Sequence, residues 1–512
     1  MGAHDSRLNR RQFLKSAAAL GLAGLTVAAR TGTAFAASKN RVVVFQGVGL
    51  DSLHPYAYSG GGISGIWQHV IEPLIEMDYS RSEYVGVLAE SWEFQGRKWL
   101  FRLRKNIRFH DGSPFTSKDV LFSFDRMVKD RKSLQASNFN EVTGIEAPDD
   151  YSVTIRTKQP NAVLLERLNN RFIVSQSATE KNGNDLDNYK IGTGPYKLVS
   201  WQRAGNLVLS RNDAYWRAKP EIKEVLVKTV KEESARVAGL LAGQADAISN
   251  LPIEEIERVE KNPRTRVEKV QGYRMYFLTM NVTHKPFDNK LVRQAFNYSV
   301  DPTVILKHIF EGNGYALNGP LNSNMIGYDP AIKRYPFDPK KARELLAKAG
   351  YPNGLEVKLY LAPDRHLKGK EVCQVIARQL AESGIKAELV PQEYPIYWGR
   401  DGVNGGKLPF YYAGRSAYDA ADTFYDQYFH TGVTKRTGYS NPELDKLIEE
   451  EQQTGDHKKR VGILQQAGRI VMEDAPVVPL YTLAEIYGLA RNIIWQGNPN
   501  NEIIVADMKI KG

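Results

Sequence analysis

The chain has 512 residues, with 69 Lys and Arg against 58 Asp and Glu, 42% hydrophobic residues and a single cysteine, Cys373. This composition excludes a disordered chain and a small disulfide scaffold, and one cysteine excludes an internal disulfide and any cysteine-cluster zinc or iron–sulfur site. The formal charge of +11 raises the question of a nucleic-acid or membrane partner, which depends on where that charge lies.

Residues 1–36 have the pattern of an export signal. The pair Arg10-Arg11 is followed by a weakly apolar stretch from Ser16 to Ala29 and then by Ala34-Phe35-Ala36. This order is typical of a twin-arginine signal with an A-x-A cleavage site, and the apolar stretch is shorter than the ~20 residues that span a bilayer. We therefore expect cleavage near Ala36-Ala37 and a soluble mature protein in a bacterial periplasm. The alternative is a basic amphipathic surface helix.

The excess of positive charge becomes small once this segment is set aside. Five basic residues and one acidic residue lie in residues 1–36, which leaves +7 on the rest of the chain. The run from Arg97 to Lys105 mixes basic and aromatic residues, as a nucleic-acid site does, but a strand with one solvated face explains it as well. We predict no nucleic-acid partner.

Strand and helix patterns alternate along the chain and predict a mixed α/β fold. Trp99, Phe101 and Leu103 alternate with polar or solvated positions, and residues 151–156 repeat the pattern. Helix starts are marked by a capping residue, in most cases followed by proline. These starts are Thr116 with Asp119, Asp301-Pro302, Asp338-Pro339 and Asn441-Pro442. Helices become frequent after about residue 285, and residues 492–510 return to strand and loop.

A search for catalytic and cofactor motifs finds none. The segment Gly192–Lys197 resembles a phosphate loop, but its proline and spacing favour a tight turn between strands. His54, His69 and His430 are scattered singly, so a metal site built from them remains only an alternative. We predict no catalytic residues, no cofactor and no metal.

Two aromatic, glycine-rich stretches are candidates for a binding cleft, because rings bury area while a few charges orient a ligand. Tyr56 and Tyr58 precede the run Gly60–Gly62, and a second stretch spans residues 394–419. The alternative is that these rings are ordinary core residues.

The chain also resembles a known family along nearly all of its length after residue 36. The matching blocks are Leu50-Asp51-Ser52-Leu53-His54-Pro55, Leu88-Ala89-Glu90-Ser91-Trp92-Glu93, Phe101 to Gly112, Gly192 to Tyr196, Arg293 to Tyr298 and Gly438 to Asp445. Together, in this order, they resemble the family 5 solute-binding proteins of ABC importers, the peptide, nickel and opine group.

The resemblance implies a two-lobed α/β periplasmic binding protein. Lobe I would comprise residues 37–281, with a subdomain inserted at about 80–187, and would be completed by residues 481–512. Lobe II would comprise residues 282–480. Crossing segments near Thr279–Val282 and Leu480–Leu483 would form the hinge.

A binding protein of this kind closes on a solute between its lobes, and the loss of water strengthens each polar contact inside. The implied partners are a small-molecule or peptide ligand, a membrane permease and its ATPase. The implied state is a soluble monomer, and the implied role is not enzymatic.

The ligand is the least determined part of the prediction. Peptide binders similar to this chain place an acidic group on the ligand amine and a basic group on its carboxylate. Arg415 stands where the family's pocket loop has tryptophan, which favours a carboxylated ligand such as an opine or sugar acid. The residues predicted to bind ligand are Tyr56, Tyr58, Tyr397, Trp398, Arg415, Tyr418, Asp419 and Asp422.

We expect a peptide or peptide-like organic solute, with an opine, a sugar acid or a nickel chelate as alternatives in the same fold. A rival from another class is a metal-dependent hydrolase exported by the twin-arginine route. It requires clustered His and carboxylate ligands, which the sequence does not show.

Overall fold

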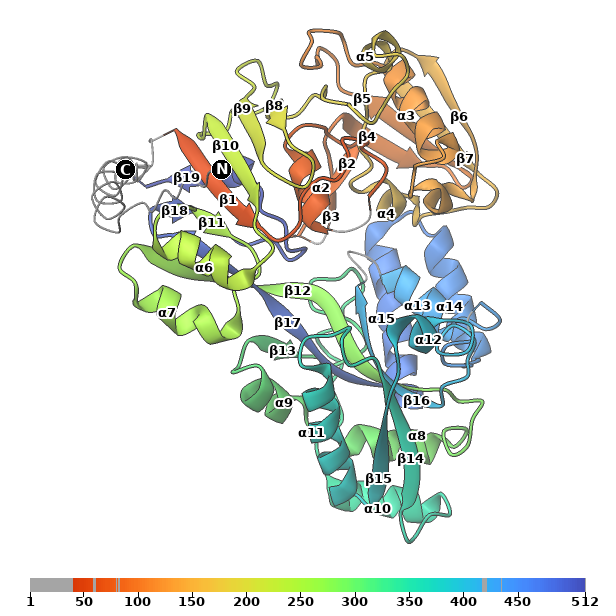
Figure 1. The fold of residues 1–512 in the computed structure, drawn as a ribbon. Helices are drawn as coiled ribbons and strands as arrows, with labels where there is room; N and C mark the ends of the chain where they lie inside the picture. The colour runs from red at the N-terminus through yellow and green to blue at the C-terminus, as the bar shows by residue number, and fades with distance from the viewer. Residues whose placement is uncertain are drawn as a thin grey trace, which may run out of the picture.

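The computed structural model describes residues 40–58, 61–79, 81, 83–416, 421–433 and 435–511. The expected export signal, residues 1–36, lies outside this part of the chain. In Figure 1 the described elements form two groups, joined by two long strands that run between them. We call the upper group lobe I and the lower group lobe II. The expected mixed α/β, two-lobed fold is confirmed.

Among the described residues, eleven strands form one large sheet that continues through both lobes. In spatial order they are β15 (Ile385–Pro391), β14 (Leu355–Leu361), β16 (Phe410–Ser416), β12 (Thr265–Met280), β17 (Val477–Ala490), β11 (Ala247–Ile248), β1 (Arg41–Gln46), β10 (Glu224–Thr229), β9 (Leu207–Arg211) and β8 (Tyr196–Trp201), with β13 (Gly314–Ala316) beside β17.

The strands β12 and β17 hold the two lobes together. They pair antiparallel from Thr265 opposite Ala490 to Thr279 opposite Val477, and the register is irregular between Gln271 and Met275. One end of the pair borders β11 of lobe I, and the other borders β16 of lobe II. The predicted boundaries at 281 and 480 remain predictions, because both strands continue across the change of lobe.

A smaller sheet occupies the upper right of Figure 1, within the range predicted for the inserted subdomain. Its strands, in order, are β4 (Ala89–Phe94), β5 (Lys98–Leu103), β7 (Ser152–Thr157) and β6 (Val142–Asp149). Trp99, Phe101 and Leu103 of β5 are buried while Arg102 is exposed. The basic and aromatic run is therefore a strand with one solvated face, as its alternation predicted.

Helices and short hairpins complete the two lobes. Lobe I contains α2 (Gly61–Gln68), α3 (Ser117–Lys129), η1 (Ala136–Phe139), α4 (Leu164–Leu168), α5 (Gln176–Lys181), α6 (Glu233–Leu241), η2 (Ile253–Glu255), α7 (Ile256–Lys261) and η3 (Val505–Asp507), with the hairpins β2 (Ile75–Asp78)–β3 (Glu83–Gly86) and β18 (Ile493–Ile494)–β19 (Lys509–Ile510). Lobe II contains α8 (Lys290–Tyr298), α9 (Pro302–Ile309), α10 (Pro339–Lys348), α11 (Gly369–Glu382), α12 (Tyr394–Trp398), α13 (Ala421–Phe429), α14 (Pro442–Gln453) and α15 (His457–Asp474).

The helix starts lie where the capping residues predicted them. The Asp301 and Asp338 carboxylates accept backbone N–H groups of the first turns of α9 and α10, at 2.8 and 2.9 Å. The Asn441 side chain does the same for α14. Cys373 of α11 is fully buried, and burial raises the pKa of its thiol, so this side chain is a packing residue.

One local prediction was wrong. The segment Gly192–Pro195 is a loop that follows a helical region and leads into β8, rather than a turn between two strands. It packs directly on the backbone of lobe I, since a Cβ at Gly192 would lie 1.8 Å from the carbonyl oxygen of Val70. Close backbone approach, rather than turn geometry, is the reason for glycine at this position.

The capping box of α3 yields a stability prediction. Asp119 accepts the N–H of Thr116 at 2.9 Å through one carboxylate oxygen and the N–H of Gln176 at 2.9 Å through the other. Asp119→Ala is expected to destabilise the protein by about 1–2 kcal/mol, because a cap is lost and two N–H groups lose their acceptor. The measurement is the urea midpoint followed by circular dichroism. Asp125→Ala, at an exposed position of the same helix, is the control and should change stability by less than about 0.5 kcal/mol.

Candidate ligand-binding site

A pocket of about 330 Å³ lies between the lobes, beside β12 and β17. Lobe I contributes Asn250, Glu254 and Asn501, and lobe II contributes Asn313 and Lys368. Because both lobes supply walls, a change in the angle between them would change the size of this pocket. This is the arrangement expected of a site that closes on its ligand.

Two opposite charges face this pocket from the connecting strands, Arg274 on β12 and Glu485 on β17. Within the described part of the chain neither side chain forms a hydrogen bond, nor an ion pair within 4 Å. Burial raises the pKa of Glu485 to about 7, although the nearby Arg274 guanidinium opposes the shift. Both side chains are half-buried. Charged groups that are partly withdrawn from water without a hydrogen bond are costly, so their presence in a cleft points to a polar ligand.

Tyr276 lines the pocket and belongs to a cluster of aromatic rings that lies behind this wall. Tyr276 stacks on Tyr481, with ring centres 5.0 Å apart, and the hydroxyl groups of Tyr412 and Tyr481 lie 2.8 Å apart. His366 meets Tyr276 edge-on and accepts the backbone N–H of Gly414 at 3.1 Å. Burial and the nearby Arg274 and Arg365 lower the pKa of His366 to about 3, so its ring is neutral and positions β16 rather than carrying charge.

An ion pair bridges the lobes at this pocket. The Lys368 ammonium lies 2.9 Å from the Glu254 carboxylate, and the Lys368 bond lowers the pKa of that carboxyl group. Lys368 precedes α11 of lobe II, and Glu254 lies in η2 of lobe I. Glu254 is more than half exposed, so the pair adds little to stability but marks a place where the lobes meet.

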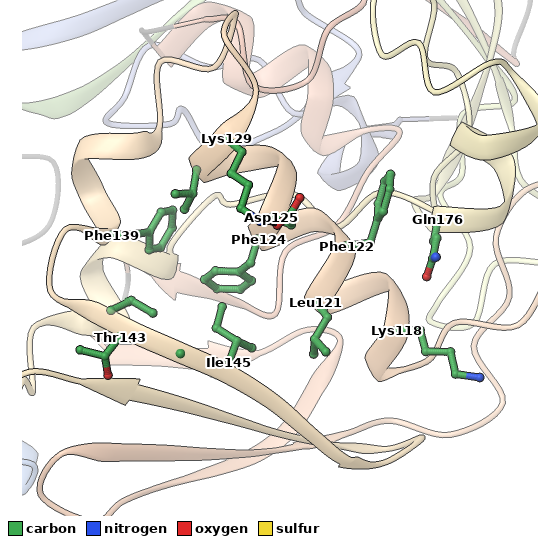
Figure 2. A pocket seen from close by; sticks show the side chains of 13 residues that line it. Lys118, Leu121, Phe122, Phe124, Asp125, Lys129, Phe139, Thr143, Ile145 and Gln176 are labelled. Carbon is green, nitrogen blue, oxygen red and sulfur yellow. Dashed lines mark ion pairs between the residues drawn. The ribbon is translucent and has the colours of Figure 1, made fainter.

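A larger cavity, of about 700 Å³, lies within the smaller sheet region and is a weaker candidate. Figure 2 shows Phe124 and Phe139 between α3 and β6, with Lys118 and Gln176 at one side. All of its walls belong to the range predicted for the inserted subdomain, so movement of the lobes would not close it. The smaller interlobe pocket therefore has the better geometry for capture.

Two of the predicted ligand-binding residues of lobe I lie close together in the structure. Tyr56 is buried in the lobe I core, and its hydroxyl group donates to the carbonyl of Phe172 at 3.0 Å. Tyr58 is half-buried, and its ring lies 6.4 Å from that of Phe172. Burial raises the pKa of both tyrosines, while Arg171 opposes the shift at Tyr58.

The predicted residues of lobe II are more dispersed. Tyr397 is buried and donates its hydroxyl hydrogen to the Tyr412 carbonyl, whereas Trp398 is half-buried with the Arg436 guanidinium 5.3 Å from its ring. Arg415 is half-buried on β16, opposite Met275 of β12. Asp422 is buried at the start of α13. Tyr418 and Asp419 lie outside the described residues.

None of the described predicted residues lines the interlobe pocket, although Arg415 belongs to the strand that pairs with Arg274 and Tyr276. The sequence reasoning missed Arg274, Glu485 and Lys368. A signal for one of them was present, because Glu485 is the one charged residue of β17, whereas Arg274 lies in a strand that also contains Arg266, Glu268 and Lys269. A charge inside such a strand faces either a partner or a ligand.

The three histidines considered as metal ligands lie apart, and each contacts different protein groups. His69 binds the Gly65 carbonyl at 2.7 Å and the Val505 N–H at 2.9 Å, and burial lowers its pKa to about 4. His54 lies 3.3 Å from Asp130, and His430 lies 3.0 Å from Asp426. Across the described ranges no group of three His, Cys, Asp or Glu residues is placed to hold a metal.

Comparison with known proteins identifies the family. A model of the bacterial extracellular solute-binding proteins, family 5, middle region, matches residues 83–436. The chain belongs to this family. It is the solute-binding component of an ABC importer, as the resemblance predicted.

Individual proteins are similar to this chain over nearly its whole length. The glutathione-binding protein GsiB of Escherichia coli strain K12 is 28% identical over 485 residues, which cover 92% of this chain and 94% of that protein. DppA of Helicobacter pylori, solved in complex with the peptide STSA, is 26% identical with a TM-score of 0.70, covering 92% of this chain and 98% of that one. HbpA2 of Haemophilus parasuis has a TM-score of 0.85 at 24% identity, covering 92% and 100%.

Family 5 proteins work outside the cytoplasmic membrane. In the part of this chain that the structure describes, no helix is long and apolar enough to cross a bilayer.

The site yields a prediction about pH. The pKa of Glu485 is raised in the folded protein, so its neutral form is favoured and the ionised form costs stability as the pH rises through about 7. Glu485→Gln is therefore expected to raise the urea midpoint relative to wild type at about pH 8 and to leave it nearly unchanged at about pH 4, below the ordinary pKa of a glutamate. The exposed Glu356→Gln removes the same charge and serves as control. An equal gain for Glu485→Gln at both pH values would contradict the prediction.

Proposed function

We propose that this chain captures a peptide or a peptide-like carboxylated solute in the pocket between its lobes and delivers it to a membrane permease driven by an ATPase. The observation that carries the proposal is the pair Arg274 and Glu485, which face the pocket and, within the described residues, form no hydrogen bond and no ion pair within 4 Å. A guanidinium group binds a carboxylate in two parallel hydrogen bonds, and a carboxylate binds an ammonium group.

The relatives support a ligand of this chemistry. Glutathione is a tripeptide with carboxylate and ammonium groups, and GsiB is named for binding it, while DppA was solved with a peptide. Arg274 would take the ligand carboxylate and Glu485 its amine, with Tyr276 as an apolar wall. We further propose that Tyr58, Arg415 and the stretch that holds Tyr418 and Asp419 contact the remainder of a longer ligand.

We propose that the protein acts as a monomer without catalytic activity. Closure around the ligand excludes water and strengthens the polar contacts, so the ligand itself stabilises the closed form that the permease recognises. This role requires neither a nucleotide site nor a metal in the chain.

Isothermal titration decides the ligand class. The panel comprises glutathione, di- and tripeptides, opines, sugar acids, nickel chelates and neutral sugars. Saturable binding of peptides supports the proposal, and binding of a neutral sugar alone overturns it. Stoichiometric zinc or iron in the purified protein, together with peptide hydrolysis, would instead support the rival metal-dependent hydrolase.

Arg274→Gln is the variant that tests the site. Loss of a charge-assisted hydrogen bond of about 1.5–3 kcal/mol weakens binding of the identified carboxylated ligand by roughly 10- to 100-fold. Arg258→Gln removes an equal charge from an exposed position on α7 and should leave the dissociation constant unchanged. Unchanged affinity in Arg274→Gln would place the ligand elsewhere.

We also propose that residues 1–36 direct the chain through the twin-arginine route. Replacing Arg10 and Arg11 by lysine keeps the charge but removes the guanidinium pair, and should leave the precursor in the cytoplasm. Cell fractionation measures the distribution, and N-terminal sequencing of the wild-type periplasmic form should begin near Ala37. Arg7→Lys is the matched control. Normal export of the double-lysine variant would contradict the proposal.

A further inference from the structure

A cluster of buried charges joins the lobes at a second place, remote from the pocket side chains. In Figure 1, α4 of lobe I lies above the helices α13, α14 and α15 of lobe II. Glu166 on α4 forms an ion pair with Arg460 on α15, and Arg460 also pairs with Glu451 on α14, through its Nε atom at 2.5 Å. The side chains of Glu166, Glu451 and Arg460 are 3%, 0% and 6% exposed.

Asp422 on α13 completes the cluster. Its carboxylate lies 3.7 Å from the Arg167 guanidinium and within hydrogen-bonding reach of the Glu166 carboxyl group. Asp422 was predicted to bind ligand, but here it contacts lobe I directly after the stretch that holds Tyr418 and Asp419. We therefore assign it a positioning role rather than a ligand contact.

The cluster contains more acid than base. Three buried carboxyl groups, from Glu166, Asp422 and Glu451, face one buried guanidinium group and the one-third exposed Arg167. One oxygen of Glu166 and one of Glu451 are buried and have no hydrogen-bond partner among the described residues. Two carboxylates cannot bond to each other, but a protonated carboxyl group can donate to a carboxylate. A proton on Glu166 that is donated to Asp422 reduces the excess negative charge of the cluster and explains why the two carboxyl groups can lie so close together.

We propose that Glu166, Asp422, Glu451 and Arg460 form a proton-sensitive latch between the lobes, which takes up about one proton when α4 docks on α13–α15. The contact also includes a backbone bond from the Ala162 N–H to the Gln452 carbonyl, at 2.6 Å, which does not titrate and sets the docking position. Opening the latch returns the carboxyl groups to water, where each ionises near its ordinary pH.

The groups around the cluster determine the direction of the pH effect. Burial and Asp422 raise the pKa of Glu166, and burial raises that of Glu451 to about 7, with Asp426 of α13 adding to the shift. Hydrogen bonding to Glu166 and the charges of Arg167 and Arg460 outweigh burial at Asp422 and lower its pKa. Arg460 stays charged, and the buried Tyr425 stays neutral.

Acids whose pKa is raised by docking favour the docked form below that pKa and oppose it as the pH rises. The pKa of Asp422 is lowered, so its carboxylate ceases to stabilise the docked form only in strong acid. The latch is therefore tightest near the ordinary pKa of a carboxyl group and weakens as the pH rises toward the raised pKa values, which for Glu451 is about 7.

The experiment follows the distance between the lobes without any ligand, so its failure is separable from failure of the proposed binding function. Lys181→Cys on α5 and Lys446→Cys on α14 place labels at exposed positions, while Cys373 is fully buried and can remain. Energy transfer between the labels is recorded from about pH 5 to about pH 9.

For the wild type, the ratio of docked to open molecules should fall by up to about tenfold per pH unit as the pH rises from the ordinary carboxyl pKa toward the raised one, and should then level off. Glu166→Gln keeps the docked form across the range, because the amide remains neutral and donates to Asp422. Glu166→Ala loses the docked form at every pH, since Arg460 loses its partner on α4. The exposed Glu356→Gln is the control and responds as the wild type does.

A distance distribution independent of pH in the wild type overturns the proposal, as does an unchanged pH response in Glu166→Gln. Circular dichroism checks that each variant folds. If Glu166→Gln does not fold, Glu451→Gln replaces it, and the same response as in the wild type would again overturn the latch.

Discussion

The pairing of β12 with β17 is the constraint on which the rest of the structure depends. Both lobes are extensions of one sheet, and these two strands carry it from β11 of lobe I to β16 of lobe II. Where the chain passes between the lobes, the ladder is irregular, and Gly272 lies so close to β17 that a Cβ would come within 2.9 Å of the Leu483 carbonyl. At this irregularity the short strand β13 also pairs with β17, and a break in register within so narrow a ribbon of sheet increases its local twist.

This connection places a polar pocket next to the irregular part of the two connecting strands. Arg274 and Glu485 lie on the two connecting strands themselves, so a ligand bound to both would touch the part of the molecule that moves. On the other side of the same ribbon, α4 meets α13–α15 through buried charges. Lobe position is therefore governed by three contributions: the bend of the ribbon, the ligand, and the ionisation of the second contact.

Buried charge has a different meaning at the two places. Glu485 and Arg274 are half-buried, face a cavity and form no hydrogen bond within the described residues, which is typical of a binding site. Glu166, Glu451 and Arg460 are paired with one another across an interface, where removal of one partner leaves an uncompensated charge. We propose that Arg274 and Glu485 bind a ligand, whereas Glu166, Glu451 and Arg460 hold the two lobes together.

The sequence by itself determined the family, the mixed α/β class and much of the local structure. Alternation in β5 and the capping residues of α3, α9, α10 and α14 are set by short-range patterns, and the structure shows each of them. Which charged side chains meet was decided only by the tertiary structure. Arg274 and Glu485 are 211 positions apart, and Glu166 and Arg460 are 294 apart, so no local pattern links either pair. The crowding of aromatic residues predicted that Tyr56 and Tyr397 line a cleft. Aromatic rings also fill protein cores, and only the tertiary packing shows that both of these rings are buried. Long-range strand pairing and lobe contact bring the functional charges together.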